Sequence, residues 1–416
     1  MIPIKRTDIR LKADPSKVIV KSLDFGDPAR VEPILNFVKE LSEVQASNQL
    51  KGIYEEFEHR HYGLGKTFLD NFSKQVADSN TDFSEVKKQL VGAYFTHEYS
   101  IEAAALFNPS IVPHPDQSGL PAGAMRFILS LRAVGEGHIS SIVFLSGIVS
   151  ANGQVILDPR ADKLTTGAVV DSEHDEASYD LRFRANMPLN GRVLFPRSNA
   201  ESNGMEDLRF VHFHDKGEAF YYGTYTAYNG HVIKPHLIET KDFLYFRIRP
   251  FKGAASSNKG MAMFPEKING RFAMIGRQGG RDLSIMFSDN LLDWDNYQLL
   301  QTPQRNWEML QMGNCGSPIK TDKGWLVLTH AVGAMRKYTL SFTLLDLEHP
   351  EQVLGSLERP LLSPNAEERE GYVPNVLYTC GLIEHTGNLI IPYAMSDSSI
   401  SFAIVRVEEV LERLKG

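Results

Sequence analysis

This sequence has few cysteines, no long apolar run and no leader segment. Only Cys315 and Cys380 occur among its 416 residues, too few for a disulfide framework or a thiolate zinc site. No apolar run approaches the roughly 20 residues that span a bilayer. Residues 1–10 are polar, so we expect no signal peptide and a reducing, cytoplasmic location; a signal removed ahead of residue 1 would make the protein periplasmic.

Concentrated positive charge is also missing. The formal net charge is -7, and the Lys and Arg residues are spread along the chain without a basic block. Nucleic-acid binding through phosphate neutralisation is therefore disfavoured. With 42% hydrophobic and 23% charged residues, the composition is that of an ordinary globular protein, for which neither nucleic acid nor a membrane is an expected partner.

The first 105 residues carry helical patterns. Asp27-Pro28 is a typical helix start, and apolar residues then recur at helical spacing as far as Val44. A second pattern runs from Leu64 to Val76, and a third from about Phe83 to Ala105. We therefore assign residues 1–105 to an N-terminal helical arm, which packs either on the main body or on a second copy in a homo-oligomer.

Residues 106–416 predict strands instead. Short apolar and aromatic runs alternate with Gly, Asn, Asp and Pro, and no long helix separates them before Val407. A weak repeat precedes successive strands at intervals of about 55 residues after a longer first interval. Its members are Asn108-Pro109, Glu206-Asp207, Phe264-Pro265, Ser317-Pro318 and Val373-Pro374. Five such units predict an all-β fold, a five-bladed β-propeller whose inner strands bring polar residues to one central pocket.

Acidic residues are the first candidates for chemistry, because cleaving a glycosidic bond requires a proton donor and an activated nucleophile. Glu206 and Asp207 stand at the start of an apolar strand. Neighbours in a strand face opposite sides, so we expect only one of the two to reach a pocket. Taken alone, such a pair is more often a salt bridge than a catalyst.

Histidines give weaker indications. His330 ends the apolar strand that begins at Trp325, where a histidine is more often a hydrogen-bonded strand end than a catalyst. His212 and His214 alternate around Phe213, but no third ligand accompanies them at metal spacing. We therefore expect no zinc, and the chemistry considered below requires no metal or cofactor.

The order of these clusters resembles that of glycoside hydrolase family 130. The resemblance covers roughly residues 106–407 and leaves out the helical arm. It rests on Asn108-Pro109, Arg132, Glu206-Asp207-Leu208-Arg209, Asn258-Lys259, the run from Phe264 to Arg271, Ser317-Pro318-Ile319-Lys320-Thr321, the run from Glu370 to Val376, and Tyr393-Ala394-Met395-Ser396-Asp397. One departure is Leu208, where the Glu-Asp-Pro-Arg motif of the family has proline.

The resemblance implies a propeller enzyme that cleaves β-mannosides with inversion. It makes Asp207 the general acid, acting through a hydroxyl group of the sugar, and a mannose-containing oligosaccharide the partner. The residues that it places around the substrate, through sugar hydroxyls or at the nucleophile, are Asn108, Arg132, Arg209, Asn258, Lys259, Arg277, Gln311, His330, Glu370 and Asp397.

Members of the family use either phosphate or water as nucleophile. On an ungapped reading, Gln311 and Ser257 stand where the family has basic residues, and Gly276 where it has histidine. Each lost cation removes charge-assisted hydrogen bonds of roughly 1.5–3 kcal/mol, which disfavours phosphate. We therefore expect an inverting hydrolase of β-mannosides, most of all β-1,2-mannosides, with Glu308 as the preferred base and Glu266 as the second candidate. A β-mannoside phosphorylase and a non-catalytic carbohydrate-binding propeller are the alternatives.

Overall fold

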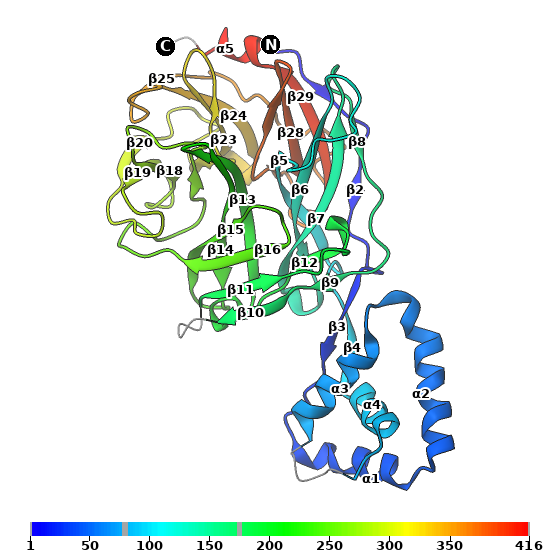
Figure 1. Cartoon of the computed structure of the whole chain (residues 1–416). Coiled ribbons are helices and arrows are strands. Elements are labelled where there is room, and N and C mark those ends of the chain that lie inside the picture. Colours follow the sequence, from blue (N-terminus) through cyan, green and yellow to red (C-terminus); the bar gives the residue numbers. More distant parts are fainter. Residues whose placement is uncertain (1, 77–81, 173–176, 415–416) are drawn as a thin grey trace. The chain divides into compact units, whose positions relative to one another are not determined.

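The computed structural model describes residues 2–76, 82–172 and 177–414 and contains two compact units (Figure 1). The smaller unit comprises Asp14–Glu102 and Ala161–Thr165. The larger comprises Met1–Ala13, Ala103–Arg160 and Thr166–Gly416. Among the helices described, none has the length and apolar character that crossing a bilayer requires.

The smaller unit is mainly helical. It contains η1 (Pro28–Arg30), α1 (Glu32–Glu40), α2 (Glu43–Phe57), η2 (Glu58–Arg60), α3 (Leu64–Gln75) and α4 (Glu85–Tyr94), beside the antiparallel strands β3 (Val18–Ser22) and β4 (Thr96–Ser100). The first predicted helix is in fact two, because Ser42 and Gln45 form a capping box that starts α2. The third ends at Tyr94, since the next residues pair as β4 with β3.

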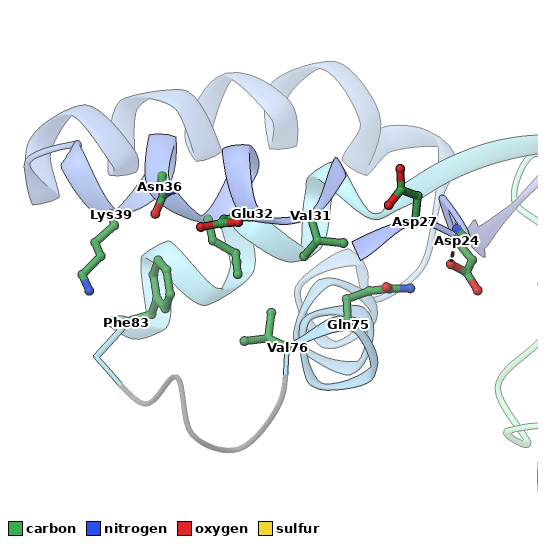
Figure 2. A pocket seen from close by; sticks show the side chains of 11 residues that line it. Asp24, Asp27, Val31, Glu32, Asn36, Lys39, Gln75, Val76 and Phe83 are labelled. Carbon is green, nitrogen blue, oxygen red and sulfur yellow. Dashed lines mark hydrogen bonds between the residues drawn. The ribbon is translucent and has the colours of Figure 1, made fainter. Parts of the chain in front are cut away.

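A cavity of about 700 Å³ lies in this smaller unit, beside α1 (Figure 2). Its lining combines the carboxylates of Asp24, Asp27 and Glu32 with apolar side chains such as Val31 and Phe83. Figure 2 shows Asp24, Asp27 and Val31 on the segment that leads into α1, Glu32 on α1 and Phe83 on the segment ahead of α4 (Glu85–Tyr94). The cavity belongs wholly to the smaller unit and is separate from the site described below.

The larger unit is built from antiparallel sheets, which excludes parallel α/β architecture. Five groups of strands follow one another along the chain. They are β5–β8 (Ala105–Pro113, Met125–Val134, Ser140–Val149, Val155–Leu157); β13–β16 (Gly204–Asp215, Glu218–Tyr228, Ile233–Thr240, Tyr245–Pro250); β17–β20 (Ala262–Met263, Phe272–Gly276, Leu283–Ser288, Gln298–Gln301); β21–β25 (Gln311–Asn314, Ile319–Lys320, Trp325–Val332, Tyr338–Leu345, Val353–Ser356); and β26–β29 (Leu377–Tyr378, Ile383–His385, Asn388–Met395, Ser399–Arg406).

Shorter elements complete the larger unit. Strands β9 (Thr165–Thr166) and β12 (Arg192–Leu194) extend the first group beyond β7, and β10 (Ala168–Ser172) and β11 (Tyr179–Arg182) extend the second beyond β16. The chain ends in α5 (Val407–Leu411).

Contacts join the five groups in cyclic order. The first and second share the parallel pair Ser140 and Gly204, and the His214 amide donates to Pro265 of the third at 2.9 Å. Asn314 of the fourth donates to Ile275 of the third. The Tyr338 amide donates to Asn375 ahead of the fifth group. The Cys380 amide returns to Pro109 of the first at 2.7 Å, so the fifth group contacts the first.

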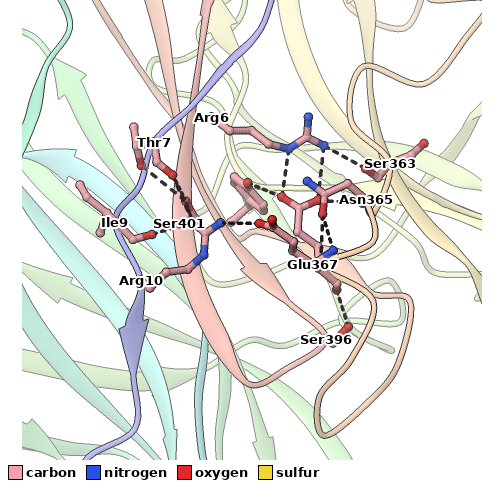
Figure 3. Close-up of polar contacts among 11 residues, drawn as sticks. Arg6, Thr7, Ile9, Arg10, Ser363, Asn365, Glu367, Ser396 and Ser401 are labelled. Atoms are coloured by element: carbon pink, nitrogen blue, oxygen red, sulfur yellow. Dashed lines mark hydrogen bonds and ion pairs between the residues drawn. The ribbon is translucent and has the colours of Figure 1, made fainter.

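The N-terminal segment completes the fifth group. Strands β1 (Lys5–Arg6) and β2 (Leu11–Lys12) pair with β29, although the sequence analysis grouped residues 1–13 with the helical arm. Arg6 donates to the Glu368 carboxylate at 2.9 Å and to the Ser363 carbonyl (Figure 3). Glu368 is fully buried and also accepts from Tyr393. These contacts hold the N-terminal strands β1 and β2 in the same sheet as β29.

Candidate active site

Asp207 lies on β13 beside Asn108 of β5, and both residues sit at irregularities of their strands. The register of β5 shifts between Phe107 and Ser110, and that of β13 shifts between Glu206 and Arg209. Asn108 has φ 49° and Asp207 φ 55°, values that residues other than glycine seldom adopt. A bulge re-aims a side chain, and here the Asn108 amide donates to the Asp207 carboxylate at 2.6 Å.

Both members of the acidic pair reach the same arginine. Arg132 donates to Asp207 at 3.1 Å and to Glu206 at 2.6 Å, and Lys259 donates to Glu206 at 2.7 Å. The left-handed backbone of Asp207 breaks the alternation of a regular strand, so both acids contact Arg132. Of the two, only Asp207 lines the pocket described below, which agrees with the expectation that one acid of the pair reaches a pocket.

The negative charge of Asp207 is strongly stabilised by its neighbours. Burial alone would raise the pKa of its carboxyl group. The positive charges of Arg132, Arg209 and Lys259, with the hydrogen bond from Asn108, outweigh burial and lower that pKa to about 2. Asp207 is therefore ionised at neutral pH.

A narrow pocket of about 30 Å³ opens beside Asp207. Its lining consists of Asp207, Arg209, Lys259, Gly260, Arg277, Gly313, Asn314, His330 and Tyr378. Within the described part of the chain, the buried Nε atoms of Arg209 and Arg277 have no hydrogen-bond partner. Buried donors are normally paired, so these two mark a place where an anionic or polar ligand is accepted.

His330 is buried at the base of the pocket. Its Nε2 lies 3.5 Å from the Arg277 guanidinium and 3.3 Å from the Gln311 amide, and its Nδ1 lies 3.2 Å from the Asn314 carbonyl. Burial, then the charges of Arg277 and Arg209, hold the pKa of His330 well below its ordinary value. The His330 imidazole is therefore neutral at neutral pH, which leaves Arg209, Arg277 and Lys259 as the cations among the described residues of the pocket lining.

The structure does not bring Glu308 and Glu266 to this pocket. Glu308 is buried, but it accepts from the Gln304 and Arg305 amides and from the Arg305 side chain, within its own turn. Glu266 pairs with Lys320 and is 40% exposed. Glu370 is exposed as well. Of the described residues that line the pocket, Asp207 alone carries a carboxylate.

Asp397 follows β28 and has φ 51°. Burial, then the neighbouring charge of Asp207, raise the pKa of the Asp397 carboxyl group to about 6, against the opposing effects of Arg132 and Arg336. Asp397 and Asp207 thus lie near enough for their charges to interact, and their pKa values lie on either side of the ordinary range. Such separation is typical of catalytic acids and bases.

Several residues at the site were not among the predicted ones. Glu206 was left aside by the alternation argument, and Asn314 and Tyr378 line the pocket from the fourth and fifth groups of strands. Tyr378 accepts from Arg209 at 2.6 Å. The repeat could have indicated Tyr378, because it follows Val373-Pro374 into the strand. Asn258 supports Lys259, whose amide donates to the Asn258 side chain.

Sequence comparison identifies a family and several relatives of the chain. The sequence profile of glycoside hydrolase family 130, described as β-1,4-mannooligosaccharide phosphorylase, matches residues 80–416. A 1,2-β-oligomannan phosphorylase of Thermoanaerobacter is 33% identical over 231 residues, 54% of this chain and 75% of the relative. A β-1,2-mannobiose phosphorylase of Listeria innocua is 30% identical over 231 residues, and the match spans 53% of this chain and only 63% of that protein.

Solved structures show the same fold at lower identity. The Listeria innocua β-1,2-mannobiose phosphorylase in complex with β-1,2-mannobiose has a TM-score of 0.53 and 20% identity, covering 75% of this chain and 92% of that one. A structure from work on family members that hydrolyse β-1,2 mannosidic linkages in Candida mannan has a TM-score of 0.55 and 15% identity, covering 75% of this chain and 87% of that one.

Proposed function

Because the chain belongs to glycoside hydrolase family 130, we propose that it cleaves β-mannosidic bonds by phosphorolysis, with inversion, and that β-1,2-linked mannosides are its substrates. The linkage is carried over from the Thermoanaerobacter and Listeria innocua relatives, which are named for β-1,2-linked mannosides. The proposal departs from the hydrolase expected from the sequence, for a reason that lies in the pocket.

The single observation that carries the proposal is the charge of that pocket. Arg209, Arg277 and Lys259 line it, two buried Nε atoms are unpaired, and Asp207 is the one carboxylate in its described lining. An inverting hydrolase needs a second carboxylate about 6.5–9.5 Å from the acid to activate water. Phosphate needs converging cationic donors instead.

Bound phosphate also explains how the Asp207 carboxyl group can carry the proton that an acid needs. With a pKa of about 2, that carboxyl group holds no proton at neutral pH. A phosphate dianion bound by Arg209, Arg277 and Lys259 places negative charge in the pocket and offsets Arg209 and Lys259, two of the cations that lower the pKa of Asp207, so that pKa rises. Asp207 then takes up the proton that passes through a sugar hydroxyl to the leaving oxygen, while phosphate attacks the anomeric carbon to give α-mannose 1-phosphate.

We place the mannosyl ring beside Asp207, on the side away from the cationic pocket, and call this space the cleft. Arg132, Asn108 and Asp397 are the residues proposed to hold its hydroxyls there. Asn108 fits this role because its buried Oδ1 has no partner among the described residues. Glu206 keeps Arg132 and Lys259 in place by bonding to both.

We also propose that the five groups of strands are five blades of a propeller, with residues 106–416 as the catalytic domain. Their antiparallel order and their cyclic contacts support this. Strands β1 and β2 then close the ring by pairing with β29. The central position of Asp207, Lys259, Asn314 and Tyr378, from four different groups, agrees with a pocket on the axis.

Hydrolysis is the second candidate, favoured by Gln311. This neutral amide lies 3.3 Å from His330, where the family resemblance leads one to expect a lysine. A pocket of 30 Å³ also accommodates a water molecule. A carboxylate brought in by substrate binding would then have to serve as base.

Product analysis distinguishes the candidates. The enzyme is incubated with β-1,2-mannobiose with and without inorganic phosphate. We expect mannose and mannose 1-phosphate in equal amounts, with no cleavage when phosphate is omitted. Mannose release independent of phosphate would establish the hydrolase, and absence of cleavage in a panel of β-mannosides would favour a carbohydrate-binding protein.

A further inference from the structure

Two hairpin tips beside the cleft share one unusual backbone. The tip between β6 and β7 contains η3 (Glu136–His138), and the tip between β23 and β24 contains η6 (Ala334–Arg336). Gly137 and His138 have φ 65° and 60°, and Met335 and Arg336 have φ 56° and 52°. Residues other than glycine are strained in this conformation, as are His138 in the first tip and Met335 and Arg336 in the second, and such strain is typical of functional loops.

Both tips follow strands that supply the site. Arg132 lies six residues before His138, and His330 lies six residues before Arg336. The charge of Arg336 acts on the Asp397 carboxyl group. Met335, at the same tip, is 89% exposed. We refer to the two tips as the rim of the site, because each follows a strand that supplies one of its residues.

Tyr372 completes this rim from the segment ahead of β26. It is 57% exposed, its ring centroid is 6.3 Å from that of His138, and its hydroxyl is 3.5 Å from the His138 Nδ1. The next residue, Val373, donates its amide to the Ser396 carbonyl at 3.0 Å, directly before Asp397. The Tyr372 ring is thus exposed, and the backbone next to it is hydrogen-bonded to the segment of Asp397.

The ring and the cations of the pocket come from different groups of strands. The cations Lys259 and Arg277 come from the third group of strands and its approach, whereas His138 and Tyr372 come from the first and fifth groups. Neither His138 nor Tyr372 lines the cationic pocket. Inversion requires the nucleophile and the leaving group on opposite faces of the sugar, so the leaving sugar is expected on a side that the pocket cations do not occupy.

We infer that Tyr372, supported by His138, is the platform on which the leaving sugar of the mannoside stacks. This inference rests on the proposed function. An aromatic ring offers a flat apolar face to the CH groups of a pyranose, and it restricts few rotatable bonds on binding. The platform selects for substrates with a second sugar and leaves recognition of the mannosyl ring to the residues around Asp207.

Binding to an inactive enzyme tests the platform without turnover. In the Asp207→Asn background, affinities are measured by calorimetry for β-1,2-mannobiose and, by competition, for methyl β-mannoside, which lacks a second sugar. Adding Tyr372→Ala weakens mannobiose binding about 3–10-fold, the range for loss of an aromatic contact, and leaves methyl β-mannoside binding unchanged. Tyr372→Phe keeps the ring and binds mannobiose within about twofold, because the contact at 3.5 Å is weak.

Tyr297→Ala is the matched control, because Tyr297 is similarly exposed, at 50%, in the third group away from this rim. It leaves both affinities unchanged. Unchanged mannobiose binding in Tyr372→Ala would overturn the platform alone, as would equal weakening for both ligands. Failure of the Asp207→Asn parent to bind either mannoside would overturn the proposed function and the platform with it.

Discussion

The contact between Arg6 and Glu368 permits a quantitative test of how the N-terminal segment holds the larger unit. The Glu368 side chain is fully buried, and that of Arg6 is 31% exposed. Arg6→Met removes the cation and keeps the aliphatic length. Breaking a buried pair typically costs about 3–5 kcal/mol, because a carboxylate is left uncompensated. Tyr393 at 2.7 Å and the Asn365 amide at 3.0 Å still donate to Glu368, so we expect a loss of about 2–3 kcal/mol.

Arg10→Met is the control on the same segment. Arg10 lies 4.0 Å from Glu367, and the two side chains are 36% and 83% exposed, so this ion pair contributes little. Arg10 also donates to the Thr7 and Ile9 carbonyls and to the Ser401 hydroxyl, so we expect its loss to cost about 1 kcal/mol, less than the loss of Arg6. Urea unfolding is followed by tryptophan fluorescence, which reports the larger unit because Trp294, Trp307 and Trp325 all lie there. Adding Glu368→Gln to Arg6→Met should restore part of the loss. Equal midpoints for the Arg6 and Arg10 variants would refute the reasoning.

Three further predictions concern the site. Asp207→Asn lowers kcat about 10²–10⁴-fold with unchanged circular dichroism, since it removes the proton donor; activity near that of the wild type would contradict this role. Arg277→Gln raises the KM for phosphate about 10–100-fold by removing charge-assisted bonds, while the KM for mannobiose changes little; equal rises in both constants would argue against an anion site. The raised pKa of Asp397, about 6, makes the folded state bind a proton more tightly than the unfolded one. This contribution to stability is complete below about pH 4 and is lost as the pH rises through 6; Asp397→Asn should remove that loss in unfolding experiments between pH 4 and 8.

Much of the architecture could be read from local patterns. The apolar strand predicted to begin at Trp325 is β23, and the helical pattern from Leu64 to Val76 corresponds to α3. These segments are regular, so period and composition determine them. Residues 1–13 could not be placed in the same way, because two-residue strands carry no periodicity and owe their pairing to β29.

The site followed the same division. Sequence motifs marked four residues that lie together in the structure, namely Asp207, Asn108, Arg132 and Lys259. Strand alternation could not predict the contacts of Glu206, because they depend on a bulge in β13 that no sequence pattern marks. Glu308 shows the opposite case: an acid well placed along the chain whose oxygens are taken up by its own turn.

The most direct test of phosphorolysis is phosphorus NMR of the wild-type enzyme with β-1,2-mannobiose and inorganic phosphate, recorded from the start of the reaction. The cationic pocket beside Asp207 predicts a growing signal of α-mannose 1-phosphate that matches the loss of phosphate. Mannobiose cleavage with an unchanged phosphate signal would contradict the account.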